Sequence, residues 1–341
     1  MLTGIIGQAW KRPLWLAYAA GVFLSQRDRV RRRREMAARG VEVPAFLIYS
    51  VTKNCNLNCA GCYSHAQDKP NLPDLPDERL LEVCREASDM GVSFILLAGG
   101  EPLVRKAVLL DAARQCPEII FPVFTNGLLA DADFIRQAKS WKNIIPVLSM
   151  EGGRYLTDDR RGNGVYERGR AMRRDMKKAG LFYAVSLTVT SKNRNELTDS
   201  VFLKELVREG CGLFFFVEYV PVKEGSENLV LNDAERADLL SRLGDLKKTV
   251  GATMIAFPGD EEEFGGCLAA GKGFVHIASD GSLEPCPFAP FSDVNLREKS
   301  LAEALGSKFL AKVRAEEGLH ETAGGCALWK ARDRMAGMLN H

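Results

Sequence analysis

Apolar runs alternate with amphipathic stretches through the middle of the chain. Six apolar runs rich in β-branched and aromatic residues are typical of buried strands, at 45–51, 92–98, 119–125, 144–150, 182–190 and 213–220. Five amphipathic stretches between them predict helices at 77–90, 103–116, 131–140, 165–179 and 200–209. This alternation predicts an α/β fold with a parallel sheet, in which catalytic groups gather at the carboxyl ends of the strands.

Three cysteines follow the first predicted strand at C-x3-C-x2-C spacing: Cys55, Cys59 and Cys62. A tight loop with this spacing brings three thiolates within reach of one cuboidal iron–sulfur cluster, whereas full ligation of a 4Fe-4S cluster by protein takes four. One iron would therefore stay open for another ligand. Two other interpretations remain: a zinc site, for which His65 is the only nearby fourth ligand, or three unrelated core thiols.

A glycine pair and a carboxylate end the second predicted strand, in the run Gly99-Gly100-Glu101-Pro102. Glycine lets the backbone approach a ligand closely, and carbonyl groups with a carboxylate accept hydrogen bonds from an ammonium group. A β-turn with a glutamate cap is the structural alternative. Taken together, the cysteine loop and this run resemble the signature motifs of the radical SAM superfamily.

That resemblance implies how the two motifs act. In the family, the open iron chelates the amino and carboxylate groups of S-adenosylmethionine (SAM), and the G-G-E-P run binds the amino group. The resemblance also implies an open partial (β/α)6 TIM barrel, because six strands do not close an eight-stranded barrel. The expected protein is an oxygen-sensitive enzyme that makes a carbon radical.

Further runs resemble the rest of the family's SAM pocket. In radical SAM enzymes of the SPASM kind, T-N-G and S-x-D-G runs approach the SAM ribose, and Thr125, Asn126 and Ser149 occupy matching positions. Glu151 stands where an aspartate is usual. Arg161 matches the arginine of the family's R-G-x-G stretch, which reaches the methionine carboxylate, and a guanidinium fork suits a carboxylate.

Two positions near these motifs need an interpretation of their own. The residue before the third cysteine is usually aromatic in the family, but here it is Gly61, so adenine stacking is expected of Tyr63. Glu218, near the end of the sixth predicted strand, could face the barrel interior and there contact substrate or transfer a proton. An internal salt bridge is the alternative, because a buried carboxylate is costly unless it is paired.

A second cysteine set occupies the last third of the chain: Cys267, Cys286 and Cys326. Asp280-Gly281 is a hairpin-turn signal that folds Cys286 back toward Cys267. The spacing resembles the C-x9-15-G-x4-C pattern of SPASM and twitch domains, which bind an auxiliary iron–sulfur cluster. The resemblance thus implies two 4Fe-4S clusters, one for SAM and one auxiliary; disulfide or core roles for the second set are the alternatives.

The first 43 residues differ in charge from the rest. They carry nine Lys/Arg and three Asp/Glu, whereas the whole chain has a net charge of only +2. An apolar run at 14–24 precedes an arginine cluster, and as a helix it would span about 16 Å, against a hydrocarbon core of about 30 Å. This pattern fits an interfacial anchor on anionic lipid, or a helix packed on the barrel with a solvated charged face.

These features divide the chain into four parts: a basic amphipathic arm (1–43), a radical SAM partial barrel (44–230), a linker helix region (231–264) and a small α+β auxiliary-cluster domain (265–341). The chain has nine cysteines and no convincing secretory signal, which favours a reducing cytoplasm. If the arm binds lipid, the protein would be peripheral at the inner membrane surface.

The expected activity is reductive cleavage of SAM to a 5'-deoxyadenosyl radical that abstracts hydrogen from an unactivated C–H bond. A small donor such as flavodoxin or ferredoxin would supply the electron. Family frequency favours a ribosomally made peptide as substrate, whereas the arm favours a membrane lipid, quinone or isoprenoid. A cluster-bearing electron carrier without enzyme activity is a third interpretation, and the nearly complete SAM pocket argues against it. Nucleic acid is not an expected partner, since one arginine run without a known module is poor evidence.

Overall fold

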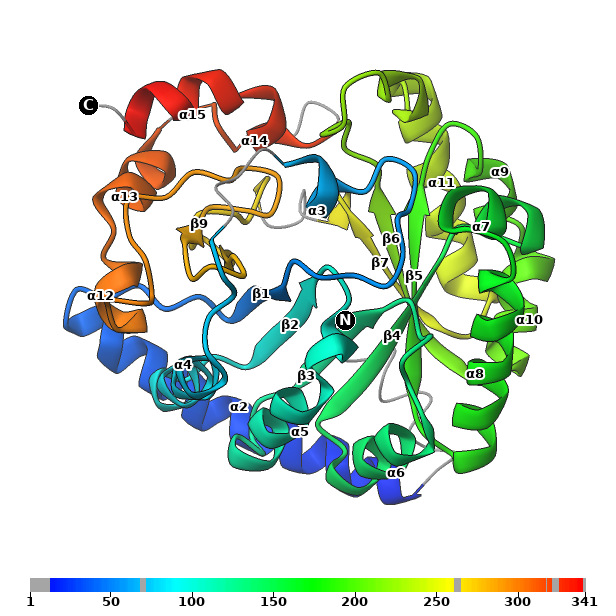
Figure 1. Ribbon diagram of the computed structural model, residues 1–341, viewed down its shortest axis with the longest axis horizontal. Coiled ribbons are helices and arrows are strands. Elements are labelled where there is room, and N and C mark those ends of the chain that lie inside the picture. The colour runs from blue at the N-terminus through cyan, green and yellow to red at the C-terminus, as the bar shows by residue number, and fades with distance from the viewer. Residues whose placement is uncertain (1–12, 68–71, 261–264, 317, 321–324, 340–341) are drawn as a thin grey trace.

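The computed structural model describes residues 13–67, 72–260, 265–316, 318–320 and 325–339. Its strands form one curved sheet in the order β7-β6-β5-β4-β3-β2-β1-β8-β9 (Figure 1). The strands are β1 (Phe46–Thr52), β2 (Phe94–Gly99), β3 (Phe121–Thr125), β4 (Ile144–Met150), β5 (Tyr183–Val189), β6 (Cys211–Glu218), β7 (Thr253–Phe257), β8 (Phe274–Ile277) and β9 (Leu283–Glu284). Within the described ranges β7 and β9 do not pair, so the barrel is open, as predicted.

Two parallel strands extend the six that the sequence predicts. β7 follows α11 (Asp233–Thr249) and pairs with β6, so the expected linker region contributes a further helix and strand. On the other side, β8 pairs in parallel with β1, with Phe46 opposite Phe274, and then turns into the antiparallel β9. The sheet therefore continues from the barrel into the C-terminal region, and the four-part division of the chain stays a prediction.

Helices cover the outer face of the sheet, and all five predicted helices are present (Figure 1). Besides α11, the helices before β7 are α2 (Pro13–Ala38), α3 (Tyr63–Ala66), α4 (Asp77–Met90), η1 (Pro102–Arg105), α5 (Lys106–Gln115), α6 (Ala132–Trp141), α7 (Arg154–Arg161), α8 (Val165–Ala179), α9 (Arg194–Leu197), α10 (Ser200–Arg208) and η2 (Glu227–Leu229). The C-terminal helices are α12 (Leu301–Leu305), α13 (Lys308–Ala315), α14 (Ala327–Lys330) and α15 (Arg332–Leu339). Asp131 caps α6, and an Asn232–Glu235 capping box starts α11. These caps satisfy backbone N–H groups at the N-terminal ends of the two helices.

The strands separate two apolar clusters, because successive side chains point to opposite faces of a sheet. On β6, Phe214 and Phe216 belong to the main core that the helices share, whereas Phe215 belongs to a smaller cluster of strand residues. The ring centroid of Phe215 lies 5.2 Å from that of Phe124 and 6.5 Å from that of Phe257. The interior wall on the β3 to β7 side is therefore apolar and aromatic.

The arginine-rich half of α2 packs partly against the barrel. Arg29 is buried and donates to the carbonyl oxygen of Val92, just before β2. Arg32 donates to the carbonyl oxygen of Ser88 in the last turn of α4, and Arg33 donates to that of Gly91 just after it. Arg27, Arg31 and Arg34 are exposed. The side chains of the apolar run 14–24 are not among those that the structure describes. In the part of the chain that is described, no helix combines the length and apolar character needed to span a membrane.

Candidate functional site

The cysteine loop leaves the carboxyl end of β1, and the glycine run that ends β2 holds it in place. The Gly100 N–H donates to the carbonyl oxygen of Thr52 (2.7 Å), and the Glu101 N–H donates to that of Asn54 (2.8 Å). The three cysteines of the loop are half-buried free thiols. The fold thus brings together the two motifs that carry the family resemblance.

Glu101 is a buried carboxylate that organises the ends of β2 and β3. Its Oε1 accepts hydrogen bonds from the Leu103 N–H (3.0 Å) and the Thr125 hydroxyl (2.6 Å), and its Oε2 accepts one from the Asn126 N–H (2.8 Å). Burial raises the pKa of Glu101, and these hydrogen bonds oppose the rise. The Asn126 side chain also donates to Oδ1 of Asn56 in the cysteine loop (2.8 Å). Three predicted site residues therefore form one connected group beside the cysteines.

Glu151 follows β4 and pairs with two arginines of α7. Its Oε1 accepts from Nε and Nη2 of Arg161, at 2.9 and 2.6 Å, and lies 2.7 Å from Nη1 of Arg160. Its Oε2 is buried and has no hydrogen-bond partner among the described residues. Such an atom is costly, and a hydroxyl group of a bound ligand would satisfy it. Ser149, two residues earlier, lies opposite Ser186 of β5.

Arg160 was not among the predicted site residues, because a loop salt bridge explained it equally well, yet it lies at the site. Its Nε donates to the carbonyl oxygen of Ala60 (3.1 Å), the Ala60 N–H donates back to the Arg160 carbonyl (2.8 Å), and its guanidinium lies 5.6 Å from the ring centroid of Tyr219. Burial opposes its charge, but Glu151 and the nearby cysteines outweigh burial and raise the pKa of Arg160. Burial also raises the pKa of the Cys59 thiol, and the two guanidinium groups oppose that rise. Positive charge is therefore fixed against the cysteine loop.

Tyr63 follows the third cysteine directly and lies between the two cysteine sets. Its hydroxyl is hydrogen-bonded to Ser50, and its ring meets that of Phe288 edge-on at 5.3 Å. Burial raises the pKa of Tyr63 well above its usual value, and the nearby Cys62 and Cys286 raise it further. Tyr63 is thus close to one cysteine of each set, and adenine stacking on its ring stays a prediction.

A buried polar chain continues from Ser50 into the C-terminal hairpin. Ser50 Oγ lies 2.8 Å from Nε2 of His276, and Nδ1 of His276 lies 2.8 Å from Oε2 of Glu284. All three side chains are buried. If Nδ1 carries the proton toward the carboxylate, Nε2 accepts from the serine hydroxyl, which can in turn accept from Tyr63. This chain ties β1 to β8 and β9, and no sequence motif marked it.

The second cysteine set also converges. The thiols of Cys286 and Cys326 are hydrogen-bonded, and this bond, burial and the nearby Cys267 raise the pKa of Cys286 well above its usual value. The Cys267 N–H donates to the carbonyl oxygen of His320 (2.9 Å). All nine cysteines lie in the described ranges and none is disulfide-bonded there, so the disulfide alternative has no support in the described structure.

A mononuclear metal site has no support in the described residues. No three His, Cys, Asp or Glu side chains there converge tightly enough to hold a single ion. This finding leaves a cuboidal cluster open, because such a cluster places its protein ligands on separate irons.

Glu218 forms an ion pair with Arg236 of α11. Nε of Arg236 lies 3.0 Å from both carboxylate oxygens, and Nη2 lies 2.5 Å from Oε1. Glu218 shares its strand face with Phe214 and Phe216, which pack toward the helices rather than into the barrel interior. This is the internal salt bridge that the sequence left as an alternative, and a catalytic role for Glu218 stays a prediction.

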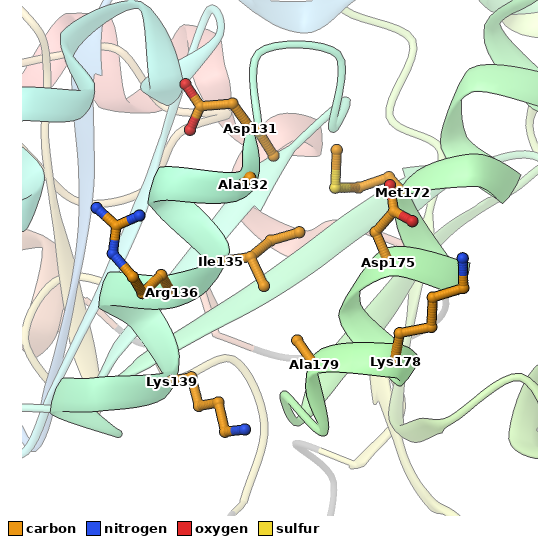
Figure 2. Close-up of a pocket in the computed structure, with 10 residues that line it drawn as sticks. Asp131, Ala132, Ile135, Arg136, Lys139, Met172, Asp175, Lys178 and Ala179 are labelled. Carbon is orange, nitrogen blue, oxygen red and sulfur yellow. The ribbon is translucent and has the colours of Figure 1, made fainter.

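A surface cavity of about 520 Å³ lies in the helix layer, between α6 and α8 (Figure 2). Ile135 and Met172 line it, together with the charged side chains of Asp131, Arg136, Lys139, Asp175 and Lys178. None of the predicted site residues lines this cavity. We therefore do not connect it with the chemistry at the strand ends.

Comparison with known proteins identifies a domain. Residues 49–201 match the model of the Radical SAM superfamily. The chain therefore carries a radical SAM domain. The AdoMet-dependent heme synthase of Methanosarcina barkeri is 26% identical over 83% of this chain and 88% of its own length. The sporulation killing factor maturation protein SkfB of Bacillus subtilis is 22% identical over 80% of this chain and 68% of its own.

Solved structures share the fold. Streptococcus suis SuiB bound to S-adenosylmethionine has a TM-score of 0.69 at 18% identity, over 87% of this chain and 74% of that one. Native anSMEcpe with bound AdoMet has a TM-score of 0.64 at 17% identity, over 86% and 98%. The predicted partial barrel and the expectation of a radical SAM enzyme are confirmed. A radical SAM domain implies SAM and a 4Fe-4S cluster, and three clustered thiols, two guanidinium groups and the Glu151 oxygen without a partner among the described residues fit them.

Proposed function

We propose that this enzyme abstracts a hydrogen atom from an unactivated C–H bond of a peptide. The observation that carries the proposal is the meeting of the cysteine loop, Glu101 and the Glu151–arginine group at one edge of the sheet. When bound there, a 4Fe-4S cluster and SAM supply reductive cleavage of SAM to methionine and a 5'-deoxyadenosyl radical, which takes the hydrogen atom.

The residues of the chain hold and orient these groups. Cys55, Cys59 and Cys62 ligate three irons and leave the fourth for SAM. The strand end at Glu101 accepts hydrogen bonds from the SAM amino group, and Glu151 Oε2 accepts one from a ribose hydroxyl. Arg161 contributes positive charge toward the methionine carboxylate. The apolar wall around Phe215 keeps water from the radical.

Cys267, Cys286 and Cys326 hold a second 4Fe-4S cluster in this proposal. The hydrogen bond between two of the thiols and the closeness of the third support it. Such a cluster would supply electron transfer during turnover, or a binding point for the substrate. A small donor such as flavodoxin or ferredoxin supplies the electron that starts each cycle.

The names and titles of two relatives support a peptide substrate. SkfB is named for maturation of a sporulation killing factor, and SuiB has been solved bound to its precursor peptide SuiA. Other relatives are named for heme synthesis and GTP cyclisation, so a radical SAM domain does not by itself select a substrate.

The alternative substrate is a lipid, quinone or isoprenoid at a membrane surface. The exposed arginines of α2, Arg27, Arg31 and Arg34, support contact with anionic lipid. The buried Arg29, bonded to the barrel, supports a structural role for the same helix. We therefore favour a peptide substrate over a lipid, quinone or isoprenoid.

A deuterium-transfer assay tests the substrate class. Cells that produce the enzyme are grown on deuterated medium, and their peptide and lipid fractions are added separately to the reconstituted enzyme with SAM and reductant. The proposal predicts deuterium in 5'-deoxyadenosine with the peptide fraction alone, and none with unlabelled fractions. Transfer from the lipid fraction alone would favour the alternative and overturn the peptide proposal.

A further inference from the structure

Tyr219 lies just beyond β6, and its hydroxyl fills the space beside the third cysteine of the loop. A Cβ built on Gly61 would lie 2.4 Å from Tyr219 Oη, closer than real Cβ contacts come. Gly61 also has a φ of +67°, in the left-handed region that favours glycine. Glycine at position 61 therefore suits both the space that Tyr219 leaves and the left-handed backbone of the loop.

The Tyr219 hydroxyl is buried and has no acceptor in the described structure. The residue is only 4% exposed, and its Oη makes no hydrogen bond within the described ranges. The guanidinium of Arg160 lies over the ring, and Arg160 is itself bonded to Ala60 of the loop. The ring is thus held between the loop and Arg160. A buried donor without a partner is costly, so this geometry points to an acceptor that the loop brings with it.

We propose that Tyr219 donates a hydrogen bond to a sulfur atom of the iron–sulfur cluster held by Cys55, Cys59 and Cys62. The inference rests on the proposed function, because it needs the cluster. The hydroxyl lies against Gly61, next to Cys62, and cluster sulfurs are the acceptors that occupation of this loop adds. Hydrogen bonds to the sulfurs help to set the reduction potential of a cluster. A donor stabilises the more negative, reduced state, so Tyr219 makes the cluster easier to reduce.

Tyr219→Phe tests this role, because it removes the hydroxyl and keeps the ring under Arg160. Tyr183→Phe is the matched control, since the Tyr183 hydroxyl on β5 is also buried without a partner in the described structure. Both variants and the wild type are reconstituted with full clusters, and redox titration is followed by electron paramagnetic resonance without SAM. The first cluster is recognised as the one whose signal changes when SAM is added afterwards.

We expect the midpoint potential of that cluster to move to a more negative value in Tyr219→Phe, with iron content unchanged. Tyr183→Phe should titrate like the wild type. An unchanged potential in Tyr219→Phe, or an equal shift in both variants, overturns the proposal. A loss of SAM affinity in Tyr219→Phe at an unchanged SAM-free potential also overturns it, because the hydroxyl would then bind SAM. If the wild type shows no SAM-responsive signal at all, the proposed function itself fails, which is a different outcome from failure of the role of Tyr219.

Discussion

Gly100 lies so close to Asn54 that a Cβ on residue 100 would come within 2.2 Å of the Asn54 carbonyl oxygen. Gly99 stands in the same relation to Thr52, at 2.4 Å from its carbonyl oxygen. Backbone oxygens cannot give way as the ends of side chains can. The glycine pair is therefore needed to dock the end of β2 onto the cysteine loop, apart from any access that it gives to a ligand.

Gly100→Ala should displace the cysteine loop. Overpacking of this kind typically costs about 1–3 kcal/mol, and we expect the first cluster to be lost and SAM cleavage to fall roughly tenfold or more. Iron analysis and 5'-deoxyadenosine formation measure both effects. Gly244→Ala on α11 is the control, since a Cβ there meets nothing within 4 Å; it should be neutral or stabilise the helix by about 0.5–1 kcal/mol. Full iron and full cleavage in Gly100→Ala would contradict the docking role.

Glu151→Gln should weaken SAM binding. The amide removes the charge that Arg160 and Arg161 share, and it replaces one acceptor oxygen by a donor. We expect a loss of affinity of about 10–100-fold, which corresponds to about 1.4–2.8 kcal/mol, in anaerobic equilibrium binding of SAM. Glu167→Gln is the control, because its ion pair with Arg154 is exposed and such pairs contribute about 0–1 kcal/mol. Equal SAM affinity in Glu151→Gln and the wild type would remove Glu151 from the pocket.

Replacement of Cys267, Cys286 and Cys326 together by alanine should halve the iron content. The wild type should hold about eight irons per chain in two 4Fe-4S clusters, and the variant about four, with SAM cleavage retained. The control replaces three other buried cysteines, Cys84, Cys116 and Cys211, and should leave the iron content unchanged. About four irons in the wild type would rule out the auxiliary cluster.

Arg236→Met should destabilise the fold, because it leaves Glu218 buried without its partner. Breaking such a pair costs about 3–5 kcal/mol, and an apolar pair in its place, as in Glu218→Leu with Arg236→Met, should restore most of the stability. Urea unfolding of the two variants measures this difference. SAM cleavage per folded molecule should match the wild type in both. If Glu218→Gln folds as stably as the wild type yet loses substrate turnover, the salt bridge is not the whole role of Glu218.

The fold and the local motifs could be predicted from the sequence because their signals are local. Apolar runs gave the strands β1 to β6, and the spacing of Cys55, Cys59 and Cys62 gave the cluster loop. β7 was missed, because Thr253–Phe257 is a short strand after a helix that was interpreted as a linker. The contact between Ser50 and His276 joins residues 226 positions apart. Such contacts depend on the pairing of β8 with β1, and no periodic pattern in the sequence predicts that pairing.

Formation of 5'-deoxyadenosine from SAM tests the central claim most directly. Anaerobically reconstituted enzyme with a strong reductant should produce it slowly even without substrate. Replacement of Cys55, Cys59 and Cys62 together by alanine should abolish it, because the variant cannot hold the cluster that SAM binds. Undiminished cleavage in that triple variant, or no cleavage by a wild type that carries its full iron, would contradict the account.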